Sequence, residues 1–425
     1  MNSEGIYEWL CCEKRKFWGG LALSIDIHYI GSRILADDTG QVMNRQRVLY
    51  LTASAGTYGA ENALFDLIRS LPKEIEPIVL VPEPGPLVDS LTGLGIQCRI
   101  VPFTILDRKY FHPFRILVYK ASALLSTLRL LKVFRQLEPA LIHTNNVLIL
   151  PGAFSAKMLG IPHVWHIREV IEGHHIHPLL WNIWRWIILT FSARVICISS
   201  AVQKQFGDNK KTVVIHDGID TALFSPSRNR SARFPKKKEF AIGIVGRLEH
   251  RRKGQDLFIE AARIALQSRK DLRFVIVGHE RDGIGDREQK LQEMVRRHGL
   301  GEKIEFRGFV KREDMPKLMN ELDVLVLCSK QPEGLGVVLL EAMACEKVVI
   351  SFAEGGPLDV IKDHVNGLLV PPQNVQKLAE AILEVAGNHK LRKSLGVEGR
   401  KTVESSFRTE LTAREIVRVY KQIRK

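Results

Sequence analysis

The chain has 425 residues, 45% hydrophobic and 26% charged, which allows two or three domains and excludes a disordered polypeptide. No apolar run reaches the roughly eighteen residues of a membrane span, and no secretory signal pattern is present, so neither is expected. The formal net charge of +15 favours an anionic partner, with nucleic acid, a membrane surface or a phosphorylated substrate as the candidates.

The chain begins with a segment unlike the rest. Residues 1–45 hold scattered apolar residues without a clear period, and the first convincing strand is Arg47–Leu51. We expect residues 1–45 to form a poorly ordered leader.

From residue 46 onward, short β-branched apolar runs alternate with amphipathic stretches. The helix expected over Gly59–Arg69 carries Leu64, Leu67 and Ile68 on one face. This alternation predicts a first domain over residues 46–224, with a parallel sheet covered by helices. Its further strands are expected at Pro77–Val81, Ala140–Thr144, Val164–Ile167, Val195–Ile198 and Val213–His216.

A second α/β unit follows a break in the pattern. Residues 225–239 hold few apolar residues and are expected to be a linker, after which the alternation resumes over residues 240–407. Residues 408–425 predict one basic helix, which we expect to pack back across the first domain. Two open sheets predict a central cleft, because ligands bind such sheets at the carboxyl ends of the strands.

Each domain opens with a strand that runs into a glycine-bearing turn. Gly59 and Ala60 follow the first strand and open a helix, where backbone N–H groups can approach a phosphate closely. The alternative is a tight turn without a ligand. In the second domain Gly246, Arg247 and Lys253 follow the first strand, and a fixed guanidinium with a mobile ammonium suits a diphosphate. Here the alternative is a solvated basic loop.

The segment between Glu333 and Glu341 is the most informative part of the sequence. Gly334, Leu335 and Gly336 form a glycine loop before an apolar helix, so Glu341 falls in the second helical turn and Glu333 in the loop. The loop N–H groups are expected to face the cleft beside a carboxylate that accepts hydrogen bonds from hydroxyls. The two acids could also be surface charges.

Histidines give a weaker signal. His166 lies near the carboxyl end of a strand, where an imidazole can meet a substrate, although a packed histidine beside Trp165 explains the pattern equally well. His174, His175 and His177 lack the helical spacing and the carboxylate that zinc usually needs. Six cysteines without a Cys-x-x-Cys pair also argue against zinc and against a disulfide framework, so no metal site and a reducing, cytoplasmic compartment are expected.

Two segments without acidic residues combine basic and apolar side chains. Residues 108–135 interleave lysines and arginines with leucines, and residues 181–189 contain three tryptophans. Basic residues with interfacial tryptophans are typical of a surface on anionic lipid. We therefore expect peripheral contact with a cytoplasmic membrane face. The alternative is a domain wall with the tryptophans in the core.

Taken together, the motifs resemble those of retaining glycosyltransferases with the GT-B architecture, glycosyltransferase group 1 or family 4. The similarity runs from about residue 47 to residue 420, and its most specific part is the Glu-x7-Glu stretch from Glu333 to Glu341. The resemblance implies two Rossmann-like domains that face a central cleft. Supporting motifs are Gly59-Ala60-Glu61, Gly246-Arg247-Leu248, Lys253-Gly254, Val277-Gly278, Gly308-Phe309-Val310 and Asn366-Gly367.

The resemblance also implies roles for the second domain. Arg247 and Lys253, beside Gly246, would bind the donor diphosphate, and Glu341 would hold the ribose hydroxyls. Glu333 would hold the transferred sugar, together with the backbone N–H groups of residues 334–336.

For the first domain, Gly59 and Ala60 would approach the diphosphate, and His166 would touch the sugar near its anomeric carbon. Two positions depart from the family pattern: Asp217 stands where asparagine is frequent, and Asp359 where glutamate is usual.

The expected function is therefore transfer of a sugar, with retention of configuration, from a UDP-, GDP- or ADP-sugar to a saccharide or lipid-linked acceptor. Such a reaction fits polysaccharide or glycolipid assembly, needs no cofactor, and involves no nucleic acid. The alternatives are a nucleotide-sugar epimerase of the same architecture and, from charge alone, a nucleic-acid-binding protein.

Overall fold

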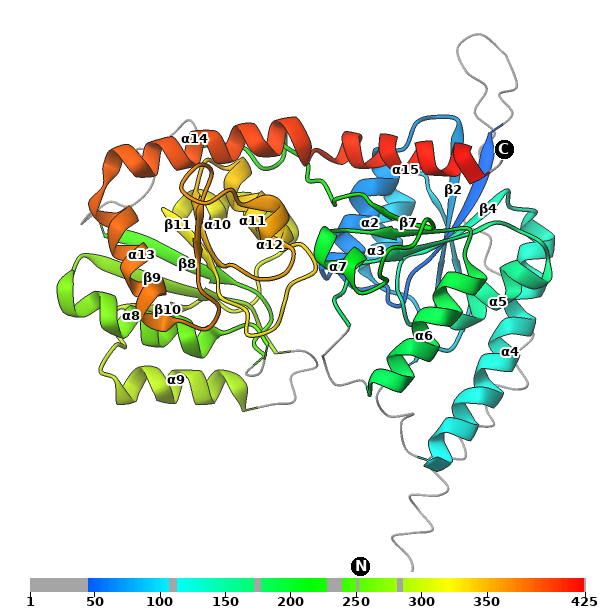
Figure 1. Ribbon diagram of the computed structural model, residues 1–425, viewed down its shortest axis with the longest axis horizontal. Coiled ribbons are helices and arrows are strands. Elements are labelled where there is room, and N and C mark those ends of the chain that lie inside the picture. The colour runs from blue at the N-terminus through cyan, green and yellow to red at the C-terminus, as the bar shows by residue number, and fades with distance from the viewer. Residues whose placement is uncertain are drawn as a thin grey trace, which may run out of the picture.

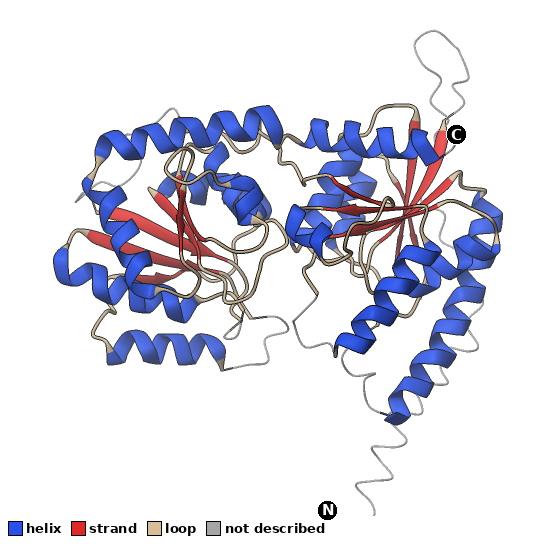
Figure 2. Ribbon diagram, viewed as in Figure 1, coloured by secondary structure: helices blue, strands red, loops and turns tan. Residues whose placement is uncertain are grey.

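The computed structural model describes residues 45–106, 113–171, 177–227, 239–249, 252–280 and 286–423. It consists of two α/β domains, each built on an open parallel sheet (Figures 1 and 2). The architecture expected from the alternating pattern is thereby confirmed. Most of the expected leader and linker lies outside the described residues.

Within the described residues, the first sheet has the strand order β3-β2-β1-β4-β5-β6-β7. Its strands are β1 (Gln46–Leu51), β2 (Ile75–Val81), β3 (Gln97–Ile100), β4 (Leu141–Thr144), β5 (His163–Ile167), β6 (Arg194–Cys197) and β7 (Thr212–Val214). Its helices are α2 (Gly59–Arg69), α3 (Pro86–Gly93), α4 (Pro113–Leu137), α5 (Leu150–Met158), α6 (Pro178–Phe191) and α7 (Ser200–Lys204).

The second sheet has the described order β10-β9-β8-β11-β12-β13. Its strands are β8 (Phe240–Val245), β9 (Leu272–Val277), β10 (Ile304–Phe306), β11 (Val324–Leu327), β12 (Val348–Phe352) and β13 (Leu368–Val370). The helical elements that follow β8 along the chain are α8 (Gln255–Ser268), α9 (Arg287–Arg297), η4 (Arg312–Asp314), α10 (Met315–Glu321), α11 (Val337–Ala344), α12 (Pro357–Val360), α13 (Val375–Gly387), α14 (His389–Ser406) and α15 (Thr409–Ile423).

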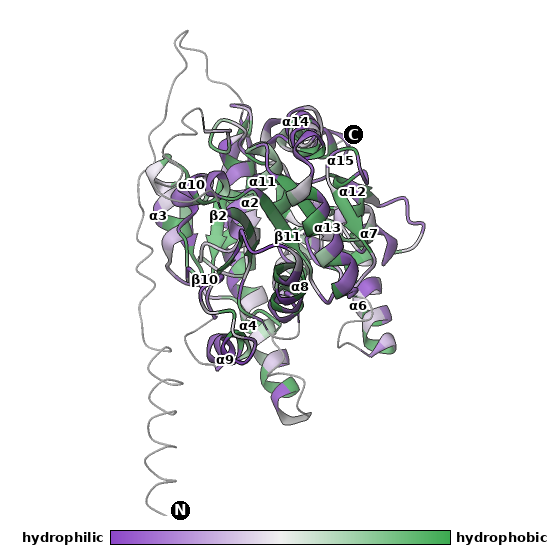
Figure 3. Cartoon of the chain, turned by 90° about the vertical axis from the view of Figure 1, so that its left-hand side faces the viewer, coloured by the Kyte–Doolittle hydropathy of each residue, from purple (hydrophilic) through white to green (hydrophobic). Residues whose placement is uncertain are grey.

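The strands read as continuous apolar runs because both faces of each sheet are covered. In β1, Val48 and Tyr50 enter one core cluster, whereas Leu49 and Leu51 enter the cluster on the opposite face. Figure 3 shows the hydrophobic residues gathered in strands and in α11, while the peripheral helix α9 is largely hydrophilic.

The last helix belongs in space to the first domain. The helix α14 runs along the second domain and ends at Ser406, with Phe407 as its C-cap, and α15 then crosses to pack on α2 (Figure 1). Tyr420 of α15 is fully buried, and its hydroxyl lies 3.0 Å from that of Tyr50 in β1. The chain therefore connects its two domains twice.

Candidate active site

The first wall of the site is the amino end of α2. Gly59 begins this helix after Tyr58, which offers no side-chain cap. The first N–H groups of an α-helix have no partner within the helix, so they can receive an anion. A Cβ added at Gly59 would meet no atom within 4 Å. This turn, predicted from Gly59 and Ala60, therefore leaves open space in front of the helix.

Arg247 faces that turn from the other domain. Its guanidinium carbon lies 5.7 Å from the centroid of the Tyr58 ring, and one nitrogen lies 3.2 Å from a Glu249 carboxylate oxygen. The side chain of Lys253 passes over Gly246, where an added Cβ would lie 3.6 Å from its Cδ. The two glycine turns predicted separately from the sequence thus lie across one gap, with Arg247 between them.

Lys253 and Glu333 form an ion pair in the site. The Lys253 Nζ donates to Glu333 Oε1 at 2.7 Å, and the Ser329 hydroxyl donates to the same oxygen. Burial alone would raise the pKa of Glu333, but the Lys253 ammonium and these hydrogen bonds hold it below its ordinary value. Glu333 is therefore ionised at neutral pH. The sequence predicted both residues for the site but not their contact.

The loop after Glu333 is pinned between the domains. A Cβ on Gly334 would lie 2.1 Å from the Arg168 carbonyl oxygen, so only glycine fits against the first domain. Gly336 has a φ of 85°, in the left-handed region, where it starts α11. Leu335 between them is buried. The loop therefore meets the carboxyl end of β5 at a fixed position.

Glu341 sits in the second turn of α11, as the spacing predicted, and is half-buried. Burial raises its pKa to about 7, although the nearby Arg312 guanidinium pulls the value down. Arg312 of η4 also pairs with Asp66, a buried residue of α2. This ion pair joins the two domains. The pair could not be expected from the sequence, because residues so distant in the chain leave no local pattern.

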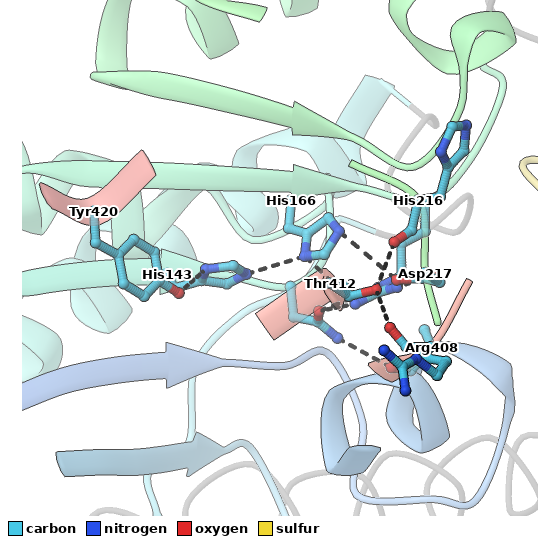
Figure 4. Close-up of polar contacts among 10 residues, drawn as sticks. His143, His166, His216, Asp217, Arg408, Thr412 and Tyr420 are labelled. Carbon is cyan, nitrogen blue, oxygen red and sulfur yellow. Dashed lines mark hydrogen bonds and ion pairs between the residues drawn. The ribbon is translucent and has the colours of Figure 1, made fainter. Parts of the chain in front are cut away.

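His166 lies at the end of β5 and is fully buried. Figure 4 shows it between His143 of β4 and Asp217. The His143 Nε2 lies 3.2 Å from His166 Nδ1, and the Tyr420 hydroxyl lies 2.7 Å from His143 Nδ1. Burial, with the Arg168 charge nearby, moves the pKa of both histidines well below the ordinary value. Both rings are therefore neutral.

Asp217 and Asp359, the two residues that depart from the family pattern, both make polar contacts. Asp217 pairs with the Arg168 guanidinium beside His166. Asp359 of α12 accepts hydrogen bonds from the Ser200 backbone N–H at 2.6 Å and from His216 Nε2 at 2.9 Å. Since Ser200 and His216 belong to the first domain, Asp359 is a second link across the interface.

Other residues that were considered for a functional role from the sequence lie away from this site. The expected contact of Trp181 with a membrane is wrong, because its side chain is 3% exposed and packs on Phe206. His177 caps α6, accepting the Leu179 N–H at its Nδ1, while positions 174 and 175 lie outside the described residues. In the described part of the chain, no three His, Cys, Asp or Glu side chains are placed to hold a metal ion.

Two family models match consecutive parts of this chain. The model for glycosyltransferase family 4 covers residues 57–223, and the model for glycosyl transferases group 1 covers residues 227–402. The boundary between them falls at the start of the expected linker. The second model therefore spans the second sheet, and the first model covers the first sheet from β2 onward, because β1 precedes residue 57.

Curated relatives are similar over part of the chain. An uncharacterized glycosyltransferase of Methanocaldococcus jannaschii is 28% identical over 64% of this chain and 72% of its own length. A GDP-mannose-dependent monoacylated alpha-(1-6)-phosphatidylinositol monomannoside mannosyltransferase of Corynebacterium glutamicum is 26% identical over 50% of this chain. The chain spans 57% of the length of that relative.

Solved structures share the fold. The Anabaena protein HepE in complex with UDP-glucose superposes with a TM-score of 0.76 at 24% identity, covering 89% of this chain and 100% of HepE. At this identity the similarity shows the architecture alone, which is the GT-B arrangement of two Rossmann-like domains.

Proposed function

Because this chain belongs to the group 1 and family 4 glycosyltransferases, we propose that it transfers a sugar from a nucleotide-diphosphate sugar to a saccharide or lipid-linked acceptor, with retention of configuration. The observation that carries this proposal is the convergence of three groups on one gap. The α2 amino end and Arg247 face each other, and the Lys253–Glu333 pair lies beside them. Nothing in the comparisons favours the epimerase alternative, and the nucleic-acid alternative rests on charge alone.

The proposed mechanism follows from where charge develops. Departure of the nucleotide leaves negative charge on the diphosphate and positive character on the sugar ring. Arg247, Lys253 and the α2 amino end are fixed donors and charges that stabilise the diphosphate. An ammonium has three N–H donors, so Lys253 can keep Glu333 while it binds a phosphate oxygen.

Glu333 is assigned to hold sugar hydroxyls. Its carboxylate is ionised and is held by hydrogen bonds from Lys253 and Ser329, so it can accept hydrogen bonds from sugar hydroxyls at a defined position. We do not assign it as a covalent nucleophile. In the proposed step the acceptor oxygen attacks the face that the nucleotide leaves, the bond to the diphosphate breaks, and a diphosphate oxygen takes the acceptor proton.

A lipid-linked acceptor agrees with one surface of the first domain. The helices α4 and α6 project from its body, and along α6 one face exposes Leu179, Leu180, Ile183 and Trp186 (Figure 1). On α4 the exposed apolar residues are Leu117, Val118, Leu124, Leu125 and Leu128. Neither helix contains an acidic residue, and both carry arginine.

We propose that this α4–α6 surface lies on an anionic membrane. Exposed apolar side chains enter the interface, and each neighbouring lysine or arginine adds roughly 1 kcal/mol near anionic lipid. No helix among the described residues combines the length and apolarity needed to cross a bilayer. The Corynebacterium relative is named for a phosphatidylinositol-based acceptor, which is compatible with this placement.

Vesicle flotation tests the membrane contact. The wild type is expected to float with vesicles containing phosphatidylglycerol, and the double variant Ile183→Ser, Trp186→Ser to stay behind. Leu94→Ser is the control, since Leu94 is 47% exposed on the same domain but away from both helices. Equal flotation of the double variant and the control would remove the α4–α6 surface from the proposal.

A thermal-shift screen against UDP, GDP, ADP and their sugar conjugates tests the function. A nucleotide at a hundredfold its dissociation constant stabilises the fold by about 2.7 kcal/mol, which gives a measurable shift. A shift with one nucleotide identifies the donor class, and release of that nucleotide from its sugar conjugate in the presence of acceptor then measures transfer. A folded protein that no nucleotide shifts would contradict the proposal.

A further inference from the structure

A buried chain of polar contacts leads from the last helix to the site histidine. It runs from the Tyr50 hydroxyl to the Tyr420 hydroxyl at 3.0 Å, on to His143 Nδ1 at 2.7 Å, and from His143 Nε2 to His166 Nδ1 at 3.2 Å. All four side chains are fully buried. These contacts lead from Tyr420 on α15 through His143 on β4 to His166 on β5 (Figure 4).

Arg168 sets the direction of the hydrogen bonds. Its Nη2 lies 3.4 Å from His166 Nδ1, and a guanidinium can only donate. His166 Nδ1 must therefore be an acceptor, so His143 Nε2 carries the proton that it donates. His143 Nδ1 in turn accepts from the Tyr420 hydroxyl, and the Tyr50 hydroxyl donates to Tyr420.

This order of hydrogen bonds leaves one unpaired donor, on His166, where the series of contacts ends. A neutral His166 that accepts at Nδ1 carries its proton on Nε2. That atom has no hydrogen-bond partner among the described residues, and an Asp217 carboxylate oxygen lies 3.9 Å from it, beyond hydrogen-bond distance. Buried donors in proteins are almost always paired, so an unpaired one points to a missing partner.

We propose that His143 and Tyr420 are positioning residues that fix His166 as its Nε2–H tautomer, so that this N–H donates to a hydroxyl of the transferred sugar. The inference rests on the proposed function for the identity of the ligand. His166 then acts as a neutral donor and not as a general base. Arg168 also ties it to the sugar-binding loop, because its carbonyl is the atom against which Gly334 packs.

Nitrogen NMR of protein labelled with ¹⁵N-histidine tests the tautomer without any assay of activity. His166 is assigned by the signal that is lost in His166→Gln. We expect its Nδ1 to show the downfield position of an unprotonated nitrogen, and its Nε2 to be protonated. A UDP-sugar is expected to shift the Nε2 signal, whereas UDP alone leaves it in place. An Nδ1–H tautomer, or no response to any nucleotide-sugar that binds, would overturn the proposal.

Two matched tyrosine variants test the positioning role. Tyr420→Phe removes the hydroxyl that donates to His143, whereas Tyr50→Phe removes a neighbouring buried hydroxyl that hydrogen-bonds neither histidine. We expect Tyr420→Phe to lower kcat about five- to tenfold, the scale of one lost hydrogen bond, with KM unchanged. Tyr50→Phe should keep both constants within about twofold of wild type.

His143 offers a rescue. His143→Leu removes the donor to His166, whereas His143→Gln restores one through its amide, so the second variant should recover most of the kcat lost in the first. Equal rates for Tyr420→Phe and Tyr50→Phe, or for the two His143 variants, would show that His143 and Tyr420 have only a structural role and do not position His166. A protein that binds nucleotide-sugars but transfers nothing would contradict the proposed function, while the NMR result would still decide the tautomer.

Discussion

At the scale of single residues, the site balances its charges unevenly. Lys253 is neutralised by Glu333 at 2.7 Å. Arg247 has the partly exposed Glu249 as its carboxylate partner, at 3.2 Å, and keeps its guanidinium toward the gap before α2. Under the proposed function, an incoming diphosphate therefore gains more from Arg247 than from Lys253. The larger share of the catalytic stabilisation should follow Arg247.

We predict that Arg247→Ala lowers kcat by about 10²–10³, the usual effect of losing one preorganised donor. Arg297→Ala is the matched control. Arg297 is 74% exposed on α9, so this variant removes the same charge at a position away from the site. Steady-state rates with the identified donor give the comparison. A folded Arg247→Ala protein with wild-type turnover would exclude this residue from the site.

The raised pKa of Glu341 predicts that donor binding depends on pH. With a pKa of about 7, the carboxyl is mostly protonated at pH 6 and mostly ionised at pH 8. Ribose hydroxyls donate best to the ionised form, so the dissociation constant of a UDP-sugar should fall about tenfold over this range, following the competent fraction. Calorimetric titration at each pH measures it. Glu341→Gln should give a flat profile, and a flat wild-type profile would refute the assignment.

The sequence allowed candidate residues to be placed on particular loops and helices, but it did not show their partners. Glu333, Glu341 and Arg247 were recognisable because their spacing follows a strand, a glycine loop and a helix start, which are local features. Arg312 and Asp66 were not recognisable, because their pairing depends on how two separate domains meet. Trp181 was placed on the surface because tryptophan suits both a membrane interface and a core, and only the packing of α6 distinguishes the two.

At the scale of elements, the loop before α11 is held by backbone contacts that a side chain would disrupt. Gly334 packs against the Arg168 carbonyl, and Gly356, which precedes α12, packs against Gly334. The loop thus lies between β5 of the first domain and α12 of its own. The geometry of the loop depends on both neighbours. The position of Glu333 therefore depends on how closely the two domains approach each other.

We predict that Gly334→Ala lowers the free energy of unfolding by about 1–3 kcal/mol, the cost of overpacking, and raises the KM for the donor. Gly93→Ala in α3 is the control, because a Cβ there meets no atom within 4 Å and alanine favours the helix. Urea denaturation and steady-state kinetics measure the two effects. A Gly334→Ala protein as stable and active as Gly93→Ala would contradict the prediction, because it would show that the loop can shift away from the Arg168 carbonyl without loss.

At the scale of the whole molecule, the two-sheet fold was predictable and the connection between its halves was only partly so. Alternating apolar runs and amphipathic stretches predicted both sheets, because buried parallel strands need helices on each side. The order of strands within each sheet leaves no such pattern, since any parallel neighbour satisfies the same apolar run.

Buried histidines predict how stability changes with pH. Burial lowers the pKa of His163 to about 3, so the unfolded chain binds a proton below pH 6.5 that the folded chain does not. This residue should therefore remove about 1.4 kcal/mol of stability per pH unit as the pH falls below 6.5. Urea denaturation of wild type and His163→Gln between about pH 7 and pH 5 measures the difference in slope. Parallel slopes would contradict the prediction.

The passage of α15 onto the first domain has a consequence for how the protein is made. The core around Val48 and Tyr50 includes Ala413, Ile416 and Tyr420 from this helix. During synthesis the first sheet leaves the ribosome long before these residues exist, and its core stays incomplete until α15 has also been made. The half of the protein that is translated first is therefore the half that finishes folding last.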